Sequence, residues 1–281
     1  GKTMLSRRLP TILPPLTLEE SLETTQIYSA AGKLPRGQPL LVRRPWRAPH
    51  HTASAAALIG GGTIPQAGEV SLAHHGVLFL DELPEFRRDA LEVLREPMET
   101  GGITLSRATR QAEFPARFQL VAAMNPCPCG CFGDPDGNCR CTPDQIQRYR
   151  ARISAPLLDR IDLQIQMPRI PWEQLQNAAA EDTATVRQRV MAARRRQQAR
   201  GFLNARLPLD RMDVLCALAA PQQQLLYKAS TRFRLSPRAI HRILRVARTI
   251  ADLDASAQIG AQHLQEAISY RCLDKQTQAG Y

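Results

Sequence analysis

Two acidic side chains stand at the end of a short apolar run. Residues 76–82 read Gly-Val-Leu-Phe-Leu-Asp-Glu, and four apolar residues in succession are typical of a strand buried on both faces of a parallel sheet. Ligands bind at the carboxyl ends of such strands. Asp81 is therefore a candidate oxygen ligand of Mg²⁺, and Glu82 is a candidate base for a water molecule. The alternative is a strand that leaves the core into a solvated acidic turn.

The first three residues, Gly1-Lys2-Thr3, look like the end of the phosphate-binding loop G-x-x-x-x-G-K-[ST]. That loop needs a preceding strand and several glycines whose backbone N–H groups surround the phosphates, and neither stands before Gly1. We therefore expect a piece that is cut inside its own phosphate loop. Chance supplies this tripeptide often, so other motifs have to support it.

Two further polar residues are candidates for phosphate chemistry. Residues 118–124 form a second predicted strand, and Asn125 at its end could orient an attacking water or contact a γ-phosphate. An asparagine that caps an ordinary turn is the alternative. Arg160 lies beside an apolar stretch and is a candidate arginine finger for a neighbouring subunit's nucleotide. The alternative for Arg160 is a local ion pair with Asp159 or Asp162.

Five of the seven cysteines crowd between Cys127 and Cys141, as C-x-C-x-C followed by C-x-C. Without an export signal, such a cluster indicates metal or free thiols rather than disulfides. Four thiolates complete the tetrahedral shell of a structural Zn²⁺, and five are available. The usual knuckle spacing is C-x₂-C, so reduced thiols without a metal are the alternative. Cys216 and Cys272 fall in helical patterns and are predicted to be core residues.

Two pairs of adjacent histidines, His50-His51 and His74-His75, also suggest metal binding. Adjacent side chains rarely face one ion, however, and histidines that pack or cap are more common. We therefore predict that neither pair holds a metal.

Periodicity predicts the elements that connect these motifs. Apolar residues recur on one face of residues 86–99, which predicts a helix that ends at Gly101-Gly102. Residues 103–107 and 111–114 alternate as the strands of a hairpin do. From about residue 171 the strand patterns disappear, and we expect successive helices.

A helix start is predicted at Ser236 and Pro237, since serine is a good N-cap and proline suits the first helical position. Arg238 falls in the first turn, where the helix dipole disfavours a cation. A nucleotide phosphate would resolve that conflict, and an exposed arginine that accepts a small penalty is the alternative. The residues that follow form one apolar stripe: Ile240, Ile243, Leu244, Ala247, Ile250 and Ala251.

Length and charge limit the classes of function. The chain has 281 residues, enough for two domains, and a net charge of +11, which favours nucleotides or nucleic acid as partners. No apolar run approaches the roughly 20 residues that cross a bilayer, and no secretory leader is seen, so we expect a cytoplasmic protein without a membrane span. Residues 183–252 hold 15 Lys and Arg against 3 Asp and Glu. The densest run includes Arg194, Arg195 and Arg196, which form either a phosphate-contacting face or a solvated one.

Several motifs together resemble a known family. Five of them occur in the order of an AAA+ ATPase: Gly1-Lys2-Thr3, residues 77–82, Asn125, residues 157–160 and Ser236-Pro237-Arg238. The stretches 47–51, 60–62, 68–74 and 125–130 closely resemble the magnesium-chelatase-like ATPases of the ComM/YifB group. The resemblance extends over essentially the whole chain, whereas the N-terminal Lon-protease-like domain of that group has no counterpart in it.

The resemblance implies an α/β fold with two domains. A P-loop AAA+ core with a parallel sheet, its first strand missing, would span residues 1–170, and an all-helical lid would span residues 171–281. Within the core we expect a helix-2-type insertion at about 35–75, a pre-sensor hairpin at about 101–117 and the cysteine cluster at 127–141.

The resemblance also implies roles for single residues. Those expected to bind ATP and its Mg²⁺ are Gly1, Lys2, Thr3, Asp81 and Arg238, and those expected to act in hydrolysis are Glu82, Asn125 and Arg160. Arg107 and Arg110 in the hairpin would contact DNA, unless they form a solvated tip. Because the family usually has an aromatic residue where Cys131 stands, the zinc ligands would be Cys127, Cys129, Cys139 and Cys141.

The function implied by the resemblance is that of a hexameric DNA motor. Such a motor hydrolyses ATP to drive helicase activity or branch migration of recombination intermediates in natural transformation. Its cofactors would be ATP and Mg²⁺, and its partner single-stranded or branched DNA. Two alternatives stay open: a magnesium-chelatase-type subunit that remodels a protein partner, and a truncated fragment that does not hydrolyse ATP.

Overall fold

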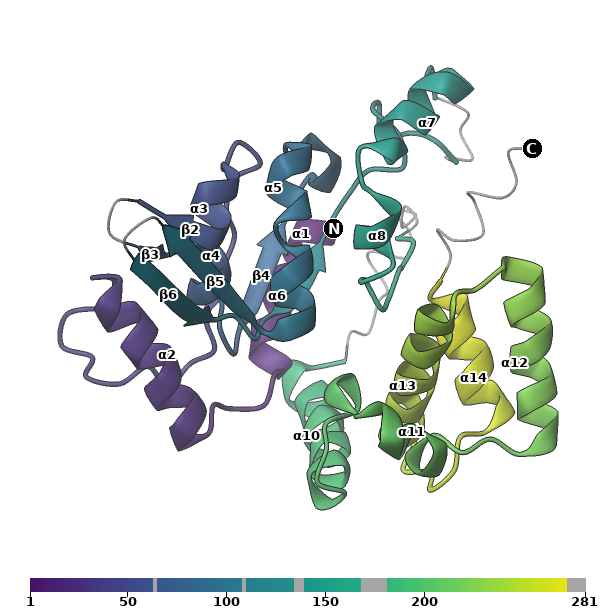
Figure 1. The fold of residues 1–281 in the computed structure, drawn as a ribbon. Helices are drawn as coiled ribbons and strands as arrows, with labels where there is room; N and C mark the ends of the chain where they lie inside the picture. Colours follow the sequence, from purple (N-terminus) through teal and green to yellow (C-terminus); the bar gives the residue numbers. More distant parts are fainter. Residues whose placement is uncertain (63–64, 108–109, 134–138, 168–180, 272–281) are drawn as a thin grey trace. The chain divides into compact units, whose positions relative to one another are not determined.

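The computed structural model describes residues 1–62, 65–107, 110–133, 139–167 and 181–271 (Figure 1). Two compact units make up the chain, Gly1–Arg160 and Ile161–Tyr281. The first unit mixes helices with a parallel sheet, and the named elements of the second are all helical. This is the arrangement of an AAA+ core followed by a helical domain, as the sequence predicts.

The sheet of the first unit has the order β1-β4-β7, and both pairings are parallel. Its strands are β1 (Trp46–Arg47), β4 (Val77–Leu80) and β7 (Gln119–Ala122). The strand predictions for residues 77–80 and 118–124 are thus confirmed. All four residues of β4 are buried, as expected for a central parallel strand.

Residues 35–75, which we predicted to be a helix-2-type insertion, contain one strand of the sheet. The sequence did not predict this strand. β1 pairs with β4 through Trp46↔Val77 and Arg47↔Leu78. Gly76 permits this approach, because a Cβ at that position would lie 2.1 Å from the carbonyl oxygen of Pro45. The other elements of the interval are α3 (Ala55–Ile59), β2 (Gly60–Gly61), β3 (Gln66–Ala67) and α4 (Glu69–Leu72). Preceding them are α1 (Lys2–Ile12) and α2 (Leu18–Ala30).

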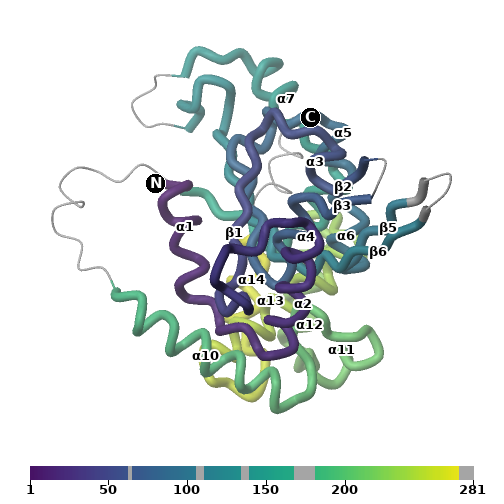
Figure 2. The backbone as a smooth tube through the Cα atoms, turned by 90° about the vertical axis from the view of Figure 1, so that its left-hand side faces the viewer, coloured from purple at the N-terminus to yellow at the C-terminus, as the bar shows by residue number. Residues whose placement is uncertain are grey.

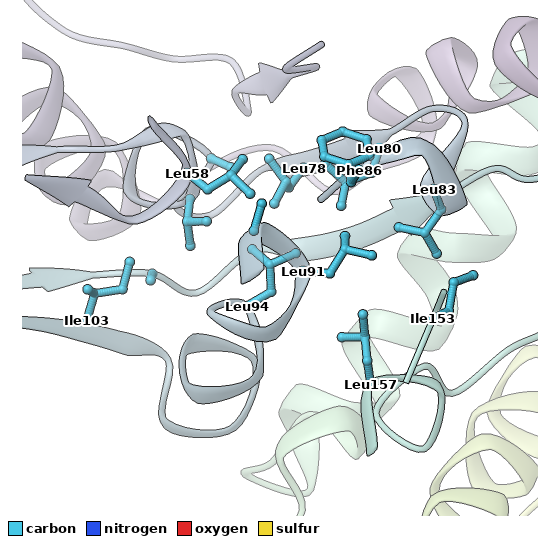
Figure 3. Packing of buried hydrophobic residues seen from close by; sticks show 14 of the residues in the cluster. Leu58, Leu78, Leu80, Leu83, Phe86, Leu91, Leu94, Ile103, Ile153 and Leu157 are labelled. Carbon is cyan, nitrogen blue, oxygen red and sulfur yellow. The ribbon is translucent and has the colours of Figure 1, made fainter. Parts of the chain in front are cut away.

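One face of the sheet carries the hydrophobic core, in which Leu78 and Leu80 pack against buried side chains such as Leu91 and Leu94 (Figure 3). The helix predicted over 86–99 is wrong in one respect, since it is broken into short pieces. These are α5 (Arg88–Glu92) and α6 (Arg95–Thr100), and the 3₁₀ turn η1 (Leu83–Glu85) precedes them. Pro97 explains the break, because it lacks an N–H and its ring collides with the carbonyl of the residue four positions earlier, Val93.

The predicted hairpin is confirmed as β5 (Gly102–Arg107) and β6 (Arg110–Pro115), which pair antiparallel from Gly102↔Pro115 to Arg107↔Arg110. Figure 2 shows this hairpin extending away from the sheet. After β7 the first unit continues through the cysteine cluster into α7 (Pro143–Ala151) and α8 (Ala155–Leu158).

The second unit begins ten residues before the boundary predicted at 170/171. Arg271 Nη1 donates to the carbonyl oxygen of Ile161, and Gln164 N donates to that of Tyr270, so residues 161–164 belong with the helices. Its elements are α10 (Thr183–Ala199), η2 (Asn204–Arg206), α11 (Leu209–Leu215), α12 (Ala220–Phe233), α13 (Pro237–Leu253) and α14 (Ala261–Ser269).

The helix start predicted at Ser236 is confirmed, because its hydroxyl accepts a hydrogen bond from Ala239 N at the start of α13. The apolar stripe faces inward, with Ile243, Ala247 and Ala251 buried. Cys216 is a core residue as predicted, whereas Cys272 lies outside the described residues. None of the described helices has the length and apolar character needed to cross a membrane.

Candidate nucleotide-binding site

The two strands that were expected to end in functional side chains are direct neighbours. β4 and β7 are parallel and in register at Leu80↔Ala122, so Asp81 and Asn125 follow the carboxyl ends of adjacent strands. The start of α1 meets both residues. Thr3 Oγ1 donates to Asp81 Oδ2 at 2.7 Å, and Lys2 Nζ donates to Asn125 Oδ1 at 2.7 Å. Residues from three distant parts of the sequence thus form one polar cluster.

This cluster has the chemistry of a phosphate and magnesium site. α1 starts at Gly1 without a side-chain cap, so its first N–H groups and the positive end of its dipole can serve an anion. Lys2 adds a positive charge at the same end. Thr3 and Asp81 offer a hydroxyl and a carboxylate oxygen, the donors that Mg²⁺ prefers. Both are partly exposed, so the donor set fits a hard cation that also binds phosphate.

Glu82 has an unusual backbone and a partner that the sequence did not reveal. Its φ is 52°, in the left-handed region that a non-glycine residue rarely occupies. Its side chain is 58% exposed, and Oε2 lies 3.1 Å from His51 Nδ1. The His51 ring in turn contacts those of His50 and Phe86. Because His51 follows β1, recognition of β1 as a neighbour of β4 would have been the signal for this contact.

The two histidines of the second pair, His74 and His75, share one carboxylate partner. His74 Nε2 and His75 Nε2 lie 3.0 Å and 2.6 Å from the same oxygen of Glu23. His75 has a φ of 54°, which turns it to the side of its neighbour. Arg117 N donates to His74 Nδ1, so in the neutral ring Nε2 carries the proton and donates it to Glu23. These contacts describe a hydrogen-bonded clamp on α2.

The pKa values of Glu23 and His74 are both lowered, so the two partners differ in charge at neutral pH. Hydrogen bonds from His74 and His75 lower the pKa of Glu23 to about 2. Burial lowers the pKa of His74 to about 4, although the hydrogen bond to Glu23 opposes this. At neutral pH the clamp therefore pairs an ionised Glu23 with a neutral, buried His74.

Arg160 pairs with Glu99, an acidic residue that the sequence did not suggest as its partner. Its side chain is 7% exposed, Nη2 lies 2.8 Å from Glu99 Oε1, and Nη1 donates to the carbonyl oxygen of Pro156. Asp162 pairs instead with Arg242 at 2.6 Å. An arginine finger must reach a neighbouring subunit, so the role in trans stays a prediction that requires Arg160 to leave Glu99.

The four predicted zinc ligands, Cys127, Cys129, Cys139 and Cys141, lie together, with all their Sγ atoms within 4.8 Å of one another. Cys131 is set apart, since its Sγ donates to the carbonyl oxygen of Cys129. The described residues thus group the same four cysteines that the resemblance selected. The identity of a bound metal stays a prediction.

The arginines expected to meet phosphate outside this cluster lie in varied surroundings. Arg195 on α10 is exposed, whereas Arg194 and Arg196 are half-buried and Arg196 Nη1 donates to the carbonyl oxygen of Asp252. Arg238 is exposed in the first turn of α13. The side chains of Arg107 and Arg110 lie outside what the structure describes. Contacts of these arginines with nucleotide or DNA stay predictions.

Comparison with protein families shows the family to which the chain belongs. A family model described as magnesium chelatase, subunit ChlI, matches residues 1–175, and a second, for the C-terminal part of that subunit, matches residues 180–271. The chain belongs to the magnesium chelatase ChlI family. The first match covers the polar cluster at Thr3, Asp81 and Asn125, and the second covers α10 to α14.

Two individual relatives show which members of the ChlI family the chain resembles. It is 50% identical over 279 residues to the protein YifB of Salmonella typhimurium, covering 98% of the chain and 54% of YifB. It is 48% identical over 276 residues to the competence protein ComM of Haemophilus influenzae, covering 97% of the chain and 54% of ComM. The chain therefore spans about half the length of these relatives. The resemblance to the ComM/YifB group is thereby confirmed.

Proposed function

We propose that the chain is the ATP-hydrolysing part of a ComM-type DNA motor. The observation that carries this proposal is the polar cluster at the carboxyl ends of β4 and β7, where Thr3 meets Asp81 and Lys2 meets Asn125. A cation and a helix start suit phosphate, and a hydroxyl paired with a carboxylate suits Mg²⁺. The cofactors of this proposal are ATP and Mg²⁺, with a structural Zn²⁺ in the four-cysteine cluster.

Each residue of the cluster has a task in the proposed reaction. Lys2 places positive charge on the β- and γ-phosphates, and Asn125, which accepts a hydrogen bond from Lys2, senses the γ-phosphate. Glu82 accepts a proton from the attacking water, while His51 orients its carboxylate. Thr3 and Asp81 hold the Mg²⁺, which neutralises charge on the transferred phosphate when it is bound.

The finer proposal is a cytoplasmic homo-hexamer that moves along single-stranded or branched DNA. Two findings support it: the relative named competence protein ComM, and the charge of residues 183–252, with 15 Lys and Arg against 3 Asp and Glu. DNA binding relies on such phosphate contacts and weakens as salt rises. In the ring, Arg160 reaches the neighbouring nucleotide and Arg238 reports it to the helical unit. Arg107, Arg110 and Arg195 are the proposed DNA contacts.

The test compares the wild-type protein with Glu82→Gln and with Glu96→Gln, an exposed glutamate on α6 that serves as the control. We expect Mg²⁺-dependent ATP hydrolysis that DNA stimulates, and ATP-dependent migration of a four-way junction. Glu82→Gln should still bind a fluorescent ATP analogue but lose at least about 100-fold in kcat. A wild-type protein that binds ATP without moving the junction contradicts the motor, and normal hydrolysis by Glu82→Gln contradicts the assigned base.

A second candidate function is remodelling of a protein partner, as in a magnesium chelatase. The family model described as magnesium chelatase, subunit ChlI, favours it because it matches residues 1–175. In that case ATP hydrolysis should occur at the same rate with and without DNA. If the chain shows no affinity for nucleotide at all, it is a non-hydrolysing fragment instead.

A further inference from the structure

The four cysteines Cys127, Cys129, Cys139 and Cys141, here called the sulfur cluster, have the spacing of metal ligands. Sγ of Cys127 lies 3.4 Å from that of Cys129 and 3.8 Å from that of Cys139, and Cys129 and Cys139 are 3.7 Å apart. All four are free cysteines. An S–S bond measures about 2.05 Å, so these separations do not belong to disulfides.

These three separations match a tetrahedral zinc site. Zn–S bonds of about 2.3 Å in a tetrahedral shell place sulfur ligands about 3.8 Å apart. The sulfur cluster can therefore receive Zn²⁺ with little movement. Among the described residues Cys131 is outside this group of four, and its Sγ donates to the carbonyl oxygen of Cys129 at 3.5 Å. Four thiolate ligands make a closed, structural site rather than a catalytic one.

Backbone N–H groups point at the sulfurs, as they do around metal-bound thiolates. Phe132 N donates to Cys127 Sγ at 3.3 Å. The backbone N–H groups of Cys131 and Arg140 also hydrogen-bond the sulfur of Cys129. These donors stabilise negative charge on sulfur before any cation is bound.

The sulfur cluster lies next to Asn125, whose side chain accepts a hydrogen bond from Lys2. Gly130, between two of the cysteines, has a φ of 81°, and a Cβ built on it would lie 3.9 Å from Cγ and Nδ2 of Asn125. From the other side, Tyr149 on α7 is buried and hydrogen-bonds the backbone of Asn125. Arg150, also on α7, donates from Nε to the carbonyl oxygen of Pro126 at 3.4 Å.

The loop of Gly130 and helix α7, which contact Asn125 and Pro126, are both attached to the cysteines. Cys127 follows Asn125-Pro126 directly, and α7 starts at Pro143, immediately after Cys141 and the capping Thr142. An ion that ties Cys127 and Cys129 to Cys139 and Cys141 therefore holds the loop and α7 together on the two sides of Asn125. Without it, the loop and α7 lose their common anchor.

We propose that the sulfur cluster holds a structural Zn²⁺ and that this ion fixes Asn125 in place at the nucleotide site. The assignment of Asn125 to a nucleotide rests on the proposed function, whereas the zinc site and its effect on Asn125 do not. Loss of zinc then loosens Asn125 and its hydrogen bond with Lys2, whereas among the described residues the pair of Thr3 and Asp81 has no contact with the sulfur cluster that would be lost.

The first experiment tests the site itself. Wild type, Cys139→Ser and the matched control Cys131→Ser are purified without chelators, and zinc per chain is measured by mass spectrometry. We expect about one zinc in the wild type and in Cys131→Ser, and at least a fivefold loss in Cys139→Ser. Co²⁺ in the wild type should give the thiolate charge-transfer and tetrahedral absorption bands of a four-sulfur site. Wild type without zinc, or equal zinc in Cys139→Ser and Cys131→Ser, overturns the site.

The second experiment tests the link to Asn125 without relying on activity. Zinc is removed from the wild type with a thiol-reactive agent and chelator and then restored, while hydrogen exchange is followed in a peptide over 119–126. We expect exchange to rise at least tenfold on removal and to recover on restoration, with α2 unchanged as the internal control. Unchanged exchange at 119–126 overturns the link. If the exchange responds but the zinc-loaded protein binds no nucleotide, the proposed function fails while this inference stands.

Discussion

Replacing Asp252 by asparagine removes one negative charge from the centre of the second unit and leaves the shape of the side chain almost unchanged. The Asp252 side chain is fully buried. Oδ1 accepts from Arg200 Nη1 at 2.7 Å and lies 3.2 Å from Arg248 Nη2, and Oδ2 accepts from Asn204 Nδ2 at 2.7 Å. The carboxylate thereby ties α10 and η2 to α13.

The expected loss of stability in Asp252→Asn depends on the two arginines, Arg248 and Arg200, that keep their positive charge without this partner. Arg248 is 3% exposed and keeps a buried positive charge, and breaking a buried ion pair costs about 3–5 kcal/mol. The side chain of Arg200 is 26% exposed and recovers some hydration, which places the expected cost near 3 kcal/mol. Opening of α13 should then become more frequent by a factor on the order of 100.

Hydrogen exchange resolved by peptide is the suitable assay, because it reports the second unit separately from the first. Protection of amides in α10 and α13 should fall by about 3 kcal/mol in Asp252→Asn. Asp213→Asn is the control, since Asp213 is exposed on α11 and its loss should change protection by less than about 0.5 kcal/mol. If the amides of α13 are equally protected from exchange in both variants, the Asp252 carboxylate does not hold these helices together.

Three further predictions concern the first unit. Because burial lowers the pKa of His74 from 6.5 to about 4, the unfolded chain takes up a proton between these pH values and the folded one does not. The free energy of unfolding, from urea titrations, should fall by up to about 3 kcal/mol as pH decreases from 6.5 to 4, and His74→Gln should abolish this slope. Gly76→Ala forces a Cβ to 2.1 Å from the Pro45 carbonyl oxygen, and the same titrations should show a loss of at least about 2 kcal/mol. His51→Ala frees the Glu82 carboxylate and should lower kcat for ATP about tenfold at constant KM; an unchanged kcat would speak against the positioning role.

The sequence by itself determined the features that depend on local pattern. The run Val77–Leu80 indicates a buried strand because every side chain is apolar, and alternation at 103–107 indicates a hairpin strand. Ser236 marks a helix start because its hydroxyl satisfies a free N–H within the same turn. The polar residues of the candidate site were found for the same reason, since Asp81 and Asn125 directly follow such strands. The clustering of the cysteines along the chain is likewise a local signal.

Only the tertiary structure decided which of these residues meet. β1 has two residues, too few for any periodicity, and only its pairing with β4 identifies it and brings His51 to Glu82. Arg160 pairs with Glu99, which lies 61 positions earlier in the sequence. His74 and His75 share Glu23, which lies on a helix far from them in the sequence. Spacing along the chain records the repeat of a helix or strand, whereas the partner of a charged group depends on how distant elements pack.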